Sequence, residues 1–371
     1  MPEDMKQMAD LSSTEKDRLT QTGLEVEMKN RSGSFFQVDQ EIRQTASLEK
    51  GIEVLSIREA LQKYDWLEDF SWKLVSKDKD QYTRYVADQP DPRGFVIIAR
   101  KGSKTVYPLQ TCLFLAKTPV QHVHNIIIAE EGAELHLISG CASASYTKTG
   151  SHIGVSEFYI GKNARITSTM IHNWGQEISV FPRSASKIEE NGIFLSNYVC
   201  MQPVRKIQMS PVADLAGKNS IARFSSIVVC TPGSFMDLGS VARLSAEGAT
   251  AELLTRAITT GGTIISRGMI EGTTGHTRGH IECKGLILKD GIIHAIPEIK
   301  GDVVDTELSH EAAVGKIARD EIEYLMSRGL DEDVATSTII RGFLDVKIAG
   351  LPQSLQDQID AAIDSAEKSG F

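Results

Sequence analysis

The sequence predicts a β-solenoid between two helical regions, and two observations support this fold class. Short apolar or alternating runs, separated by glycine-containing turns, follow one another from Gly94 to about Lys300. Turn motifs around Gly132, Gly161 and Gly248 recur at separations of 29 and 87 residues, and the second is three times the first. A fixed recurrence is typical of stacked coils, each resting on the next. An antiparallel β-sandwich stays the alternative on these grounds alone.

The first 93 residues are charged and patterned for helices. Segments Ser12–Met28 and Ser56–Trp72 each begin with a serine that can cap a helix, followed by apolar residues at helical spacing. Prolines and a glycine cluster in Gln89–Gly94, which predicts a boundary there. We therefore expect a mostly helical N-terminal region over residues 1–93 and a β core over residues 94–303.

The core region carries several runs with strand character. Each is a short apolar or alternating stretch bounded by turn residues. The predicted strands are Phe95–Ala99, Val123–Ile128, Glu134–Ile138, Glu157–Ile160, Arg165–Met170, Ala222–Val229, Thr263–Ile265 and Gly285–Leu288.

From residue 304 to residue 371 the pattern becomes helical again. We expect a first helix capped by Ser309, followed by helices over Asp320–Ser327, Asp331–Phe343 and, last, around Leu355–Ala366. The acidic residues of this region argue against a DNA-binding helix-turn-helix. They favour a surface on which another protein docks.

Charge and cysteine content narrow the function classes. The formal net charge is −9, and the five cysteines include no CxxC pair. Nucleic acid is not expected as a partner, because phosphate binding needs clustered Lys and Arg. The odd number of cysteines, the polar N-terminus and the lack of an apolar run of about 18 residues predict a cytoplasmic protein without a membrane span.

The densest group of reactive side chains lies in the segment Gly275–Gly285 and is followed by His294, His310 and Glu311. Thiol, imidazole and carboxylate groups are the ligands of iron and zinc. On a strand, Cys283 would share an apolar face with Ile281, because side chains alternate between faces. A buried structural cysteine is the alternative to a metal ligand.

No nucleotide-binding loop is present in the sequence. It contains no GxxxxGK[ST] motif, no GxGxxG motif after a predicted strand, and no GxSxG motif. Without a glycine-rich backbone cradle and its lysine, the chain is not expected to bind or hydrolyse ATP by the P-loop route.

Several motifs, taken in their order along the chain, resemble the SufB/SufD family of iron–sulfur cluster assembly scaffolds. They are Pro108–Thr111, Gly140–Tyr146, Asn173–Trp174, Gly275–Gly285, Ser309–Ile317 and Glu323–Leu330. The chain is most similar to the shorter, archaeal-type, SufB-like members. The resemblance implies a mainly β fold, a right-handed parallel β-helix flanked by N-terminal and C-terminal helical regions. It also implies a homodimer and a SufC-like ATPase of the ABC class as the partner that docks on the C-terminal helices.

The resemblance also implies roles for individual residues. Cys283 matches the cysteine that ligates the cluster, and His310 and Glu311 match a histidine and the acidic residue that follows it. Cys141 matches the cysteine that accepts sulfur from a donor, which the sequence does not identify. The implied function is a scaffold and not an enzyme, with a transient iron–sulfur cluster at the dimer interface and ATP hydrolysis in the partner.

One departure from the family pattern concerns the sulfur path. Leu113 and Leu115 stand where the bacterial SufB sequences have polar residues. We therefore expect the path of sulfur through this chain to differ.

Two other functions fit parts of the sequence. The first is a β-helix enzyme similar to polysaccharide lyases, although such enzymes are usually secreted and present an acidic and basic groove. The second is a zinc-binding β protein with a mononuclear site, built from His276, His280, Cys283 and His294.

Overall fold

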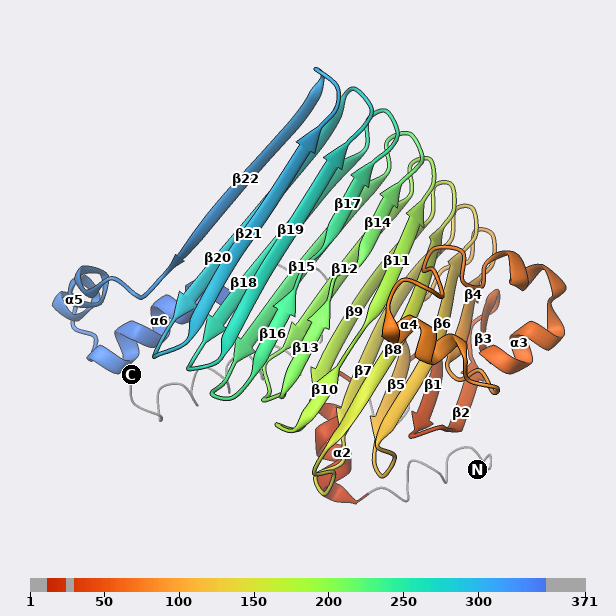
Figure 1. The fold of residues 1–371 in the computed structure, drawn as a ribbon, viewed down its shortest axis with the longest axis horizontal. Helices are drawn as coiled ribbons and strands as arrows, with labels where there is room; N and C mark the ends of the chain where they lie inside the picture. The colour runs from red at the N-terminus through yellow and green to blue at the C-terminus, as the bar shows by residue number, and fades with distance from the viewer. Residues whose placement is uncertain (1–11, 25–29, 345–371) are drawn as a thin grey trace.

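The strands of the chain stack as coils of a parallel β-solenoid, with helices near both ends (Figure 1). The computed structural model describes residues 12–24 and 30–344. Two sheets form the long sides of the coils, and parallel backbone pairing joins each coil to the next. The predicted fold class is confirmed, and the antiparallel sandwich is excluded.

The first sheet has ten strands, and their order follows the coils from the N-terminal end. Only its first pair is antiparallel; the later strands pair in parallel. In spatial order the strands are β2 Glu41–Ser47, β1 Gly33–Val38, β5 Leu109–Leu115, β7 Glu134–Ser143, β9 Arg165–Asn173, β12 Ile193–Cys200, β15 Ile221–Cys230, β18 Thr250–Thr259, β20 Thr277–Ile287 and β22 Thr306–Gly315.

The second sheet has twelve strands. They are β10 Ile178–Val180, β13 Lys206–Met209, β16 Phe235–Leu238, β19 Thr263–Gly272, β17 Val241–Leu244, β14 Val212–Leu215, β11 Arg183–Ile188, β8 Gly150–Ile160, β6 Val120–Ala129, β4 Phe95–Ala99, β3 Ile52–Ser56 and β21 Ile292–Gly301. Three coils contribute two short strands in place of one long strand. Proline lacks a backbone N–H and glycine weakens a strand, which explains the breaks. They contain Pro182, Pro211 and Gly239.

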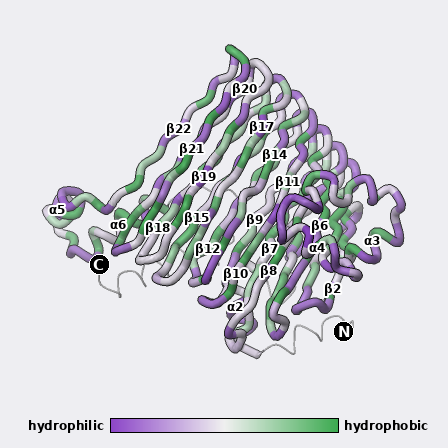
Figure 2. Tube along the Cα trace, in the orientation of Figure 1, coloured by the Kyte–Doolittle hydropathy of each residue, from purple (hydrophilic) through white to green (hydrophobic). Residues whose placement is uncertain are grey.

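Alternate residues of each strand face the interior of the coils. Hydrophobic and hydrophilic residues alternate along many of the strands (Figure 2). On β18, Ala251 and Leu253 belong to the main core cluster, as do Ile264 and Ile270 on β19. Removing these side chains from water drives the coils together.

Each middle coil enters the first sheet through a residue with left-handed backbone geometry, one or two positions before the strand. Gly132 has a φ of 69° and Asn163 a φ of 56°, and these two are equivalent. Gly161, which the sequence analysis aligned with Gly132, lies two residues before the equivalent position, Asn163. The recurrence is real, but asparagine often replaces glycine because it tolerates this conformation. The turn residues are Gly132, Asn163, Asn191, Asn219, Gly248 and His276.

The N-terminal region contains three strands as well as helices, so its prediction as mostly helical was incomplete. The serine caps at Ser12 and Ser56 are confirmed, each in a capping box with a glutamate. β1 and β3 extend the two sheets by pairing with β5 and β4, which local sequence spacing does not reveal. The two predicted segments contain shorter helices: α2 Ser13–Thr20 in the first, and α3 Ile57–Lys63 and the 3-10 helix η2 Asp65–Asp69 in the second. A further helix, α4 Gln81–Ala87, was not predicted.

The helix expected from Ser309 is wrong, because this segment forms strand β22. Its sequence favours a helix locally, but pairing with β20 over the whole strand overrides that preference. Two other predicted helices are confirmed as α5 Arg319–Ser327 and α6 Glu332–Leu344. The last predicted helix, Leu355–Ala366, lies outside the described residues.

α6 packs against the outer face of the first sheet. Ile340 and Leu344 of this helix join a buried cluster with Ile258 of β18 and Leu286 of β20. Within residues 12–24 and 30–344, none of the helices is long and apolar enough to cross a membrane.

Candidate functional site

Cys283 lies on the inner face of β20, as the alternation of its strand predicts. Its side chain is 2% exposed and belongs to the main core cluster. Ser266 Oγ on β19 donates a weak hydrogen bond to Cys283 Sγ at 3.7 Å. Burial raises the pKa of the Cys283 thiol, and the hydrogen bond from Ser266 offsets only part of that rise. In this state the thiol is protonated at neutral pH.

His310 and Glu311 lie on β22, the last strand of the first sheet. His310 pairs with Ile281, and Ala312 pairs with Cys283. Paired residues of parallel neighbours point to the same face. His310 therefore shares the inner face with Cys283, roughly 8 Å away along the diagonal, while Glu311 points to the outer face.

Glu311 takes part in a group of ion pairs on the outer face. Lys284 Nζ lies 3.4 Å from the carboxylate of Glu311 and 2.8 Å from that of Glu282, which also pairs with Arg256. Among the described residues, no three His, Cys, Asp or Glu side chains gather closely enough to hold a metal ion. A single chain does not bring the predicted ligand set together.

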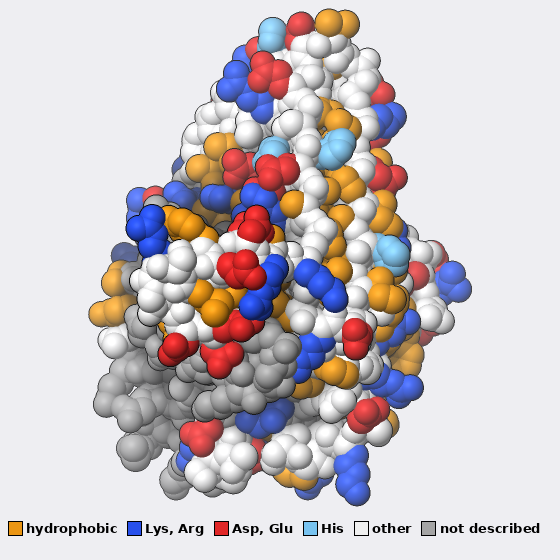
Figure 3. Space-filling view, turned by 90° about the vertical axis from the view of Figure 1, so that its left-hand side faces the viewer, with side chains coloured by type: hydrophobic (Ala, Val, Ile, Leu, Met, Phe, Trp, Pro, Cys, Tyr) orange, Lys and Arg blue, Asp and Glu red, His pale blue; other side chains and the backbone are white. Residues whose placement is uncertain are grey.

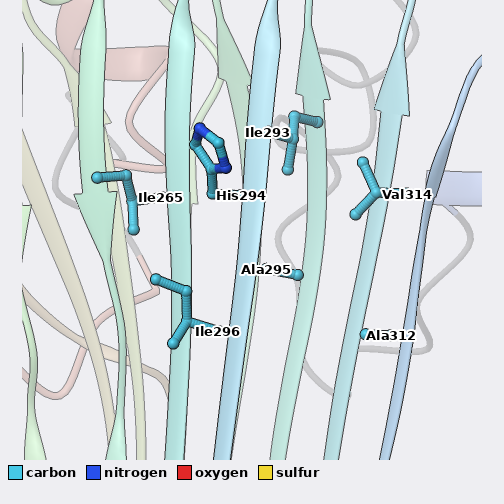
Figure 4. A pocket seen from close by; sticks show the side chains of 7 residues that line it. All are labelled: Ile265, Ile293, His294, Ala295, Ile296, Ala312 and Val314. Atoms are coloured by element: carbon cyan, nitrogen blue, oxygen red, sulfur yellow. The ribbon is translucent and has the colours of Figure 1, made fainter.

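The last coil, formed by β21 and β22, leaves one end of the solenoid open. Figure 3 faces this end and shows hydrophobic side chains along it, with histidines among them. A groove of about 520 Å³ lies here. The outer edge of β22 pairs with no described strand, so its backbone groups are available. Figure 4 shows the side chains that line the groove: Ile265, Ile293, His294, Ala295, Ile296, Ala312 and Val314.

The four residues considered for a zinc site do not converge. Cys283 faces the interior, whereas His280 points outward and its Nδ1 lies 2.9 Å from Ser309 Oγ. His276 occupies a turn with a φ of 57°. His294 lies at the groove on β21. The zinc alternative is wrong for the described chain.

Cys141 lies on the inner face of β7 and is 1% exposed. Its neighbours on the adjacent strands are Leu113 and His172. Leu113 and Leu115 both belong to the core, so apolar side chains close one side of Cys141. Burial raises the pKa of the Cys141 thiol to about 12.

Raising the pH from about 8 to about 10 should destabilise the wild-type protein more than a Cys141→Ala variant, by about 2 kcal/mol. An unfolded thiol ionises near pH ~8.5, but the folded thiol stays protonated up to about 12. The stability that the protonated Cys141 thiol contributes is therefore fully present below pH ~8.5 and is lost as the pH rises toward about 12. Urea unfolding of both proteins at both pH values measures the difference; identical losses would contradict it.

A row of buried polar side chains continues from Cys141 into the next coils. His172 Nδ1 lies 2.9 Å from the Tyr198 hydroxyl. The ring of Trp174 lies 5.4 Å from that of His172 and 5.1 Å from that of His152. Burial lowers the pKa of both histidines, that of His152 to about 3, so both are neutral. The sequence analysis gave His172 no role, although its spacing of 31 residues from Cys141 is that of one coil.

The outer face of the second sheet carries a buried carboxylate that the sequence analysis also missed. Glu157 accepts hydrogen bonds from the backbone N–H groups of Trp72, Leu74 and Val75, at 2.6, 2.6 and 3.1 Å. His124 Nε2 lies 2.8 Å from the same carboxylate. Burial alone would raise the pKa of Glu157, but these hydrogen bonds lower it overall. The Glu157 carboxylate therefore binds the segment before α4 to the outer face of the second sheet.

Comparisons with known proteins identify the family. A family model described as "SUF system FeS cluster assembly, SufBD core domain" matches residues 113–343. An "Iron-sulfur cluster assembly SufBD family protein" of Archaeoglobus fulgidus is 47% identical over 355 residues, which is 95% of each chain. A protein of the same description from Methanothermobacter thermautotrophicus is 42% identical, over 94% of this chain and 87% of its own. This chain therefore belongs to the SufBD family of iron–sulfur cluster assembly proteins.

Proposed function

We propose that the chain is a scaffold on which an iron–sulfur cluster is assembled between two copies. Cys283, His310 and Glu311 of both chains would be the ligands, since thiolate, imidazole and carboxylate groups bind iron. The observation that carries this proposal is the position of Cys283, one strand away from the open end. A second copy that paired with β22 would place the two Cys283 residues roughly 14 Å apart, with both His310 residues between them.

The single chain is incomplete as a ligand set, which fits a site shared by two chains. Cys283 and Glu311 point to opposite faces of the sheet, and Cys283 is covered. Some rearrangement of β22 has to precede ligation. A cluster held by few thiolates and by mixed ligands is easier to pass on than one held by four cysteines.

α6 offers a mechanical connection to Cys283. Ile340 and Leu344 pack with Leu286, which stands three residues after Cys283 on β20. A shift of α6 would therefore act directly on the strand that carries the thiol. Such shifts of packed helices are a common way of opening a site.

The C-terminal region is the proposed docking surface for a SufC-like ATPase of the ABC class. α5 exposes Tyr324 and Met326 to solvent, and large exposed apolar side chains often mark protein contacts. A pocket between α5 and α6 includes Leu325 and Ile339. ATP hydrolysis would take place in this partner, and its movement would reach β20 through α6.

Cys141 is the proposed sulfur acceptor. Its Sγ attacks the outer sulfur of a donor persulfide, R–S–SH; the donor S–S bond breaks, and the donor leaves as a thiol with the proton that Cys141 gives up. β7 and β20 are five strand positions apart, so sulfur has to travel roughly 24 Å to reach Cys283. An interior route is supported by the residues that pair with Cys283 across successive strands in the direction of Cys141. They are Thr255, Ser226 and Tyr198.

Substituting the two cysteines should separate their roles. A Cys283→Ser variant should fail to hold a cluster even when iron and sulfide are supplied chemically without oxygen, because it has lost a ligand. A Cys141→Ser variant should reconstitute like the wild type, because free sulfide bypasses the acceptor. In cells, both variants should impair cluster assembly. Absorbance and Mössbauer spectra of the reconstituted proteins measure the outcome.

Cys200 provides a matched control for this experiment, since it is equally buried and has no role in the proposal. A Cys200→Ser variant should behave like the wild type both in chemical reconstitution and in cells. If Cys141→Ser and Cys283→Ser behave alike in reconstitution, the assignment of roles is wrong.

A further inference from the structure

Two hydrogen-bond donors near Cys141 lack a partner within the described part of the chain. They are Trp174 Nε1 and Ser143 Oγ. Trp174 is 2% exposed and Ser143 is fully buried. Buried polar groups are almost always hydrogen-bonded, so two unsatisfied donors in one region mark a place for a further partner, either an ordered water or a ligand.

Both donors belong to the same inner corner of the solenoid as Cys141. Ser143 follows Cys141 by two residues on β7 and therefore shares its face. Trp174 comes directly after β9, whose His172 is the ladder neighbour of Cys141. A Cβ atom built on Gly175 would lie 3.4 Å from Ser143 Oγ, so the chain that follows Trp174 passes beside Ser143.

A positive charge on α2, which packs outside the first sheet, reaches the backbone at Trp174. Arg18 of α2 donates hydrogen bonds from Nη2 to the backbone carbonyls of Asn173 and Trp174, at 3.2 and 3.4 Å. Arg18 Nε is buried and has no partner among the described residues. A nearby guanidinium group reduces the cost of placing an anion in a buried site.

We infer that Trp174 and Ser143 bind the sulfane sulfur that Cys141 carries after sulfur transfer. This inference rests on the proposed role of Cys141 as the acceptor. The products of the transfer are Cys141–S–SH and the donor thiol, so one S–S bond breaks and one forms without net oxidation. When the outer sulfur loses its proton it becomes an anion, and hydrogen bonds to an anion are the strong ones. The proton passes to a base in solvent, since burial keeps the neighbouring His172 neutral.

The lifetime of the sulfur adduct tests this inference. Full-length protein, kept free of oxygen, is treated with glutathione persulfide, and mass spectrometry follows the added sulfur atom on the peptide that contains Cys141. Excess dithiothreitol then removes it. Ser143→Ala and Trp174→Phe should each shorten the lifetime of the adduct by about tenfold, because each removes one hydrogen bond to a charged group.

Ser139→Ala is the matched control. Ser139 precedes Cys141 by two residues on the same face, but its hydroxyl accepts a hydrogen bond from Thr111 Oγ1 at 2.8 Å. Its variant should keep the wild-type lifetime. Thermal unfolding of each variant shows whether it is folded, and Ser143→Ala, which removes a single oxygen atom, decides the result if Trp174→Phe does not fold.

Two outcomes would overturn the inference in different ways. Equal lifetimes in Ser143→Ala and Ser139→Ala would remove the binding role of Ser143 and Trp174 while leaving Cys141 as the acceptor. If the folded wild type gains no sulfur on Cys141, the proposed role of Cys141 fails, and this inference fails with it.

Discussion

Replacing Glu157 with alanine should lower the free energy of unfolding by about 3–5 kcal/mol. The carboxylate accepts three backbone hydrogen bonds and contacts His124, all in a buried setting. Alanine leaves these donors without an acceptor and removes several of the contacts between the segment before α4 and the second sheet. Urea unfolding near neutral pH measures the loss.

A surface glutamate gives the control for Glu157. Glu190 pairs with Lys162 at 2.8 Å, but both side chains are about half exposed. Glu190→Ala should change the stability by less than about 1 kcal/mol, as exposed ion pairs usually do. If both variants lose a similar amount of unfolding free energy, the buried hydrogen bonds of Glu157 stabilise the protein no more than an exposed ion pair does.

The contribution of Glu157 also has a pH dependence of defined sign. Because the pKa of Glu157 in the folded chain is lowered, its contribution is present above the pKa of an unfolded glutamate, about 4.3. The contribution is lost as the pH falls through the folded value. The difference between the wild type and Glu157→Ala should therefore shrink in acid.

Gly217→Ala is the second substitution for which we expect a large effect. A Cβ atom at Gly217 would lie 1.9 Å from the backbone nitrogen of Glu190 and 2.1 Å from the carbonyl carbon of Glu189. These backbone atoms belong to the neighbouring coil, so relief requires the two coils to separate. We expect a loss of about 3 kcal/mol or more, measured as the shift in the urea unfolding midpoint.

Gly132→Ala distinguishes this steric effect from a conformational one. An added Cβ at Gly132 meets no atom within 4 Å, but the φ of 69° is unfavourable for alanine. The expected cost is about 1–2 kcal/mol. If Gly217→Ala costs no more than Gly132→Ala, the close approach of the coils is not what selects glycine at residue 217.

Parts of the fold were readable from the sequence because their signal is local. Phe95–Ala99 was predicted with the bounds of β4, since a continuous apolar run between turn residues fits a buried strand. β10, with three residues, is too short to display any period. Ser309 looked like a helix cap, and only the pairing of β22 with β20 shows that the segment is a strand.

At the candidate site, too, the sequence predicts features that depend on neighbouring residues and misses those that depend on distant ones. The inward direction of Cys283 follows from strand alternation, which acts over a few residues. The opposite orientation of Glu311 depends on the register between β20 and β22, which no local pattern contains. The contact between Glu157 and Trp72 joins residues that are 85 positions apart in the chain.

The two edges of the first sheet differ in a way that bears on how many chains can associate. At one edge, β2 carries an ion pair between Glu41 and Arg43, and the register of its pairing with β1 shifts between Phe36 and Gln37. Charges and irregular register both discourage strand addition. At the other edge, β22 ends in the uncharged run Ala312–Gly315. Chains joined through β22 would cover the edge of the first sheet that is suited to strand addition, so association through the described strands of this sheet would close at a pair and not continue into a fibre.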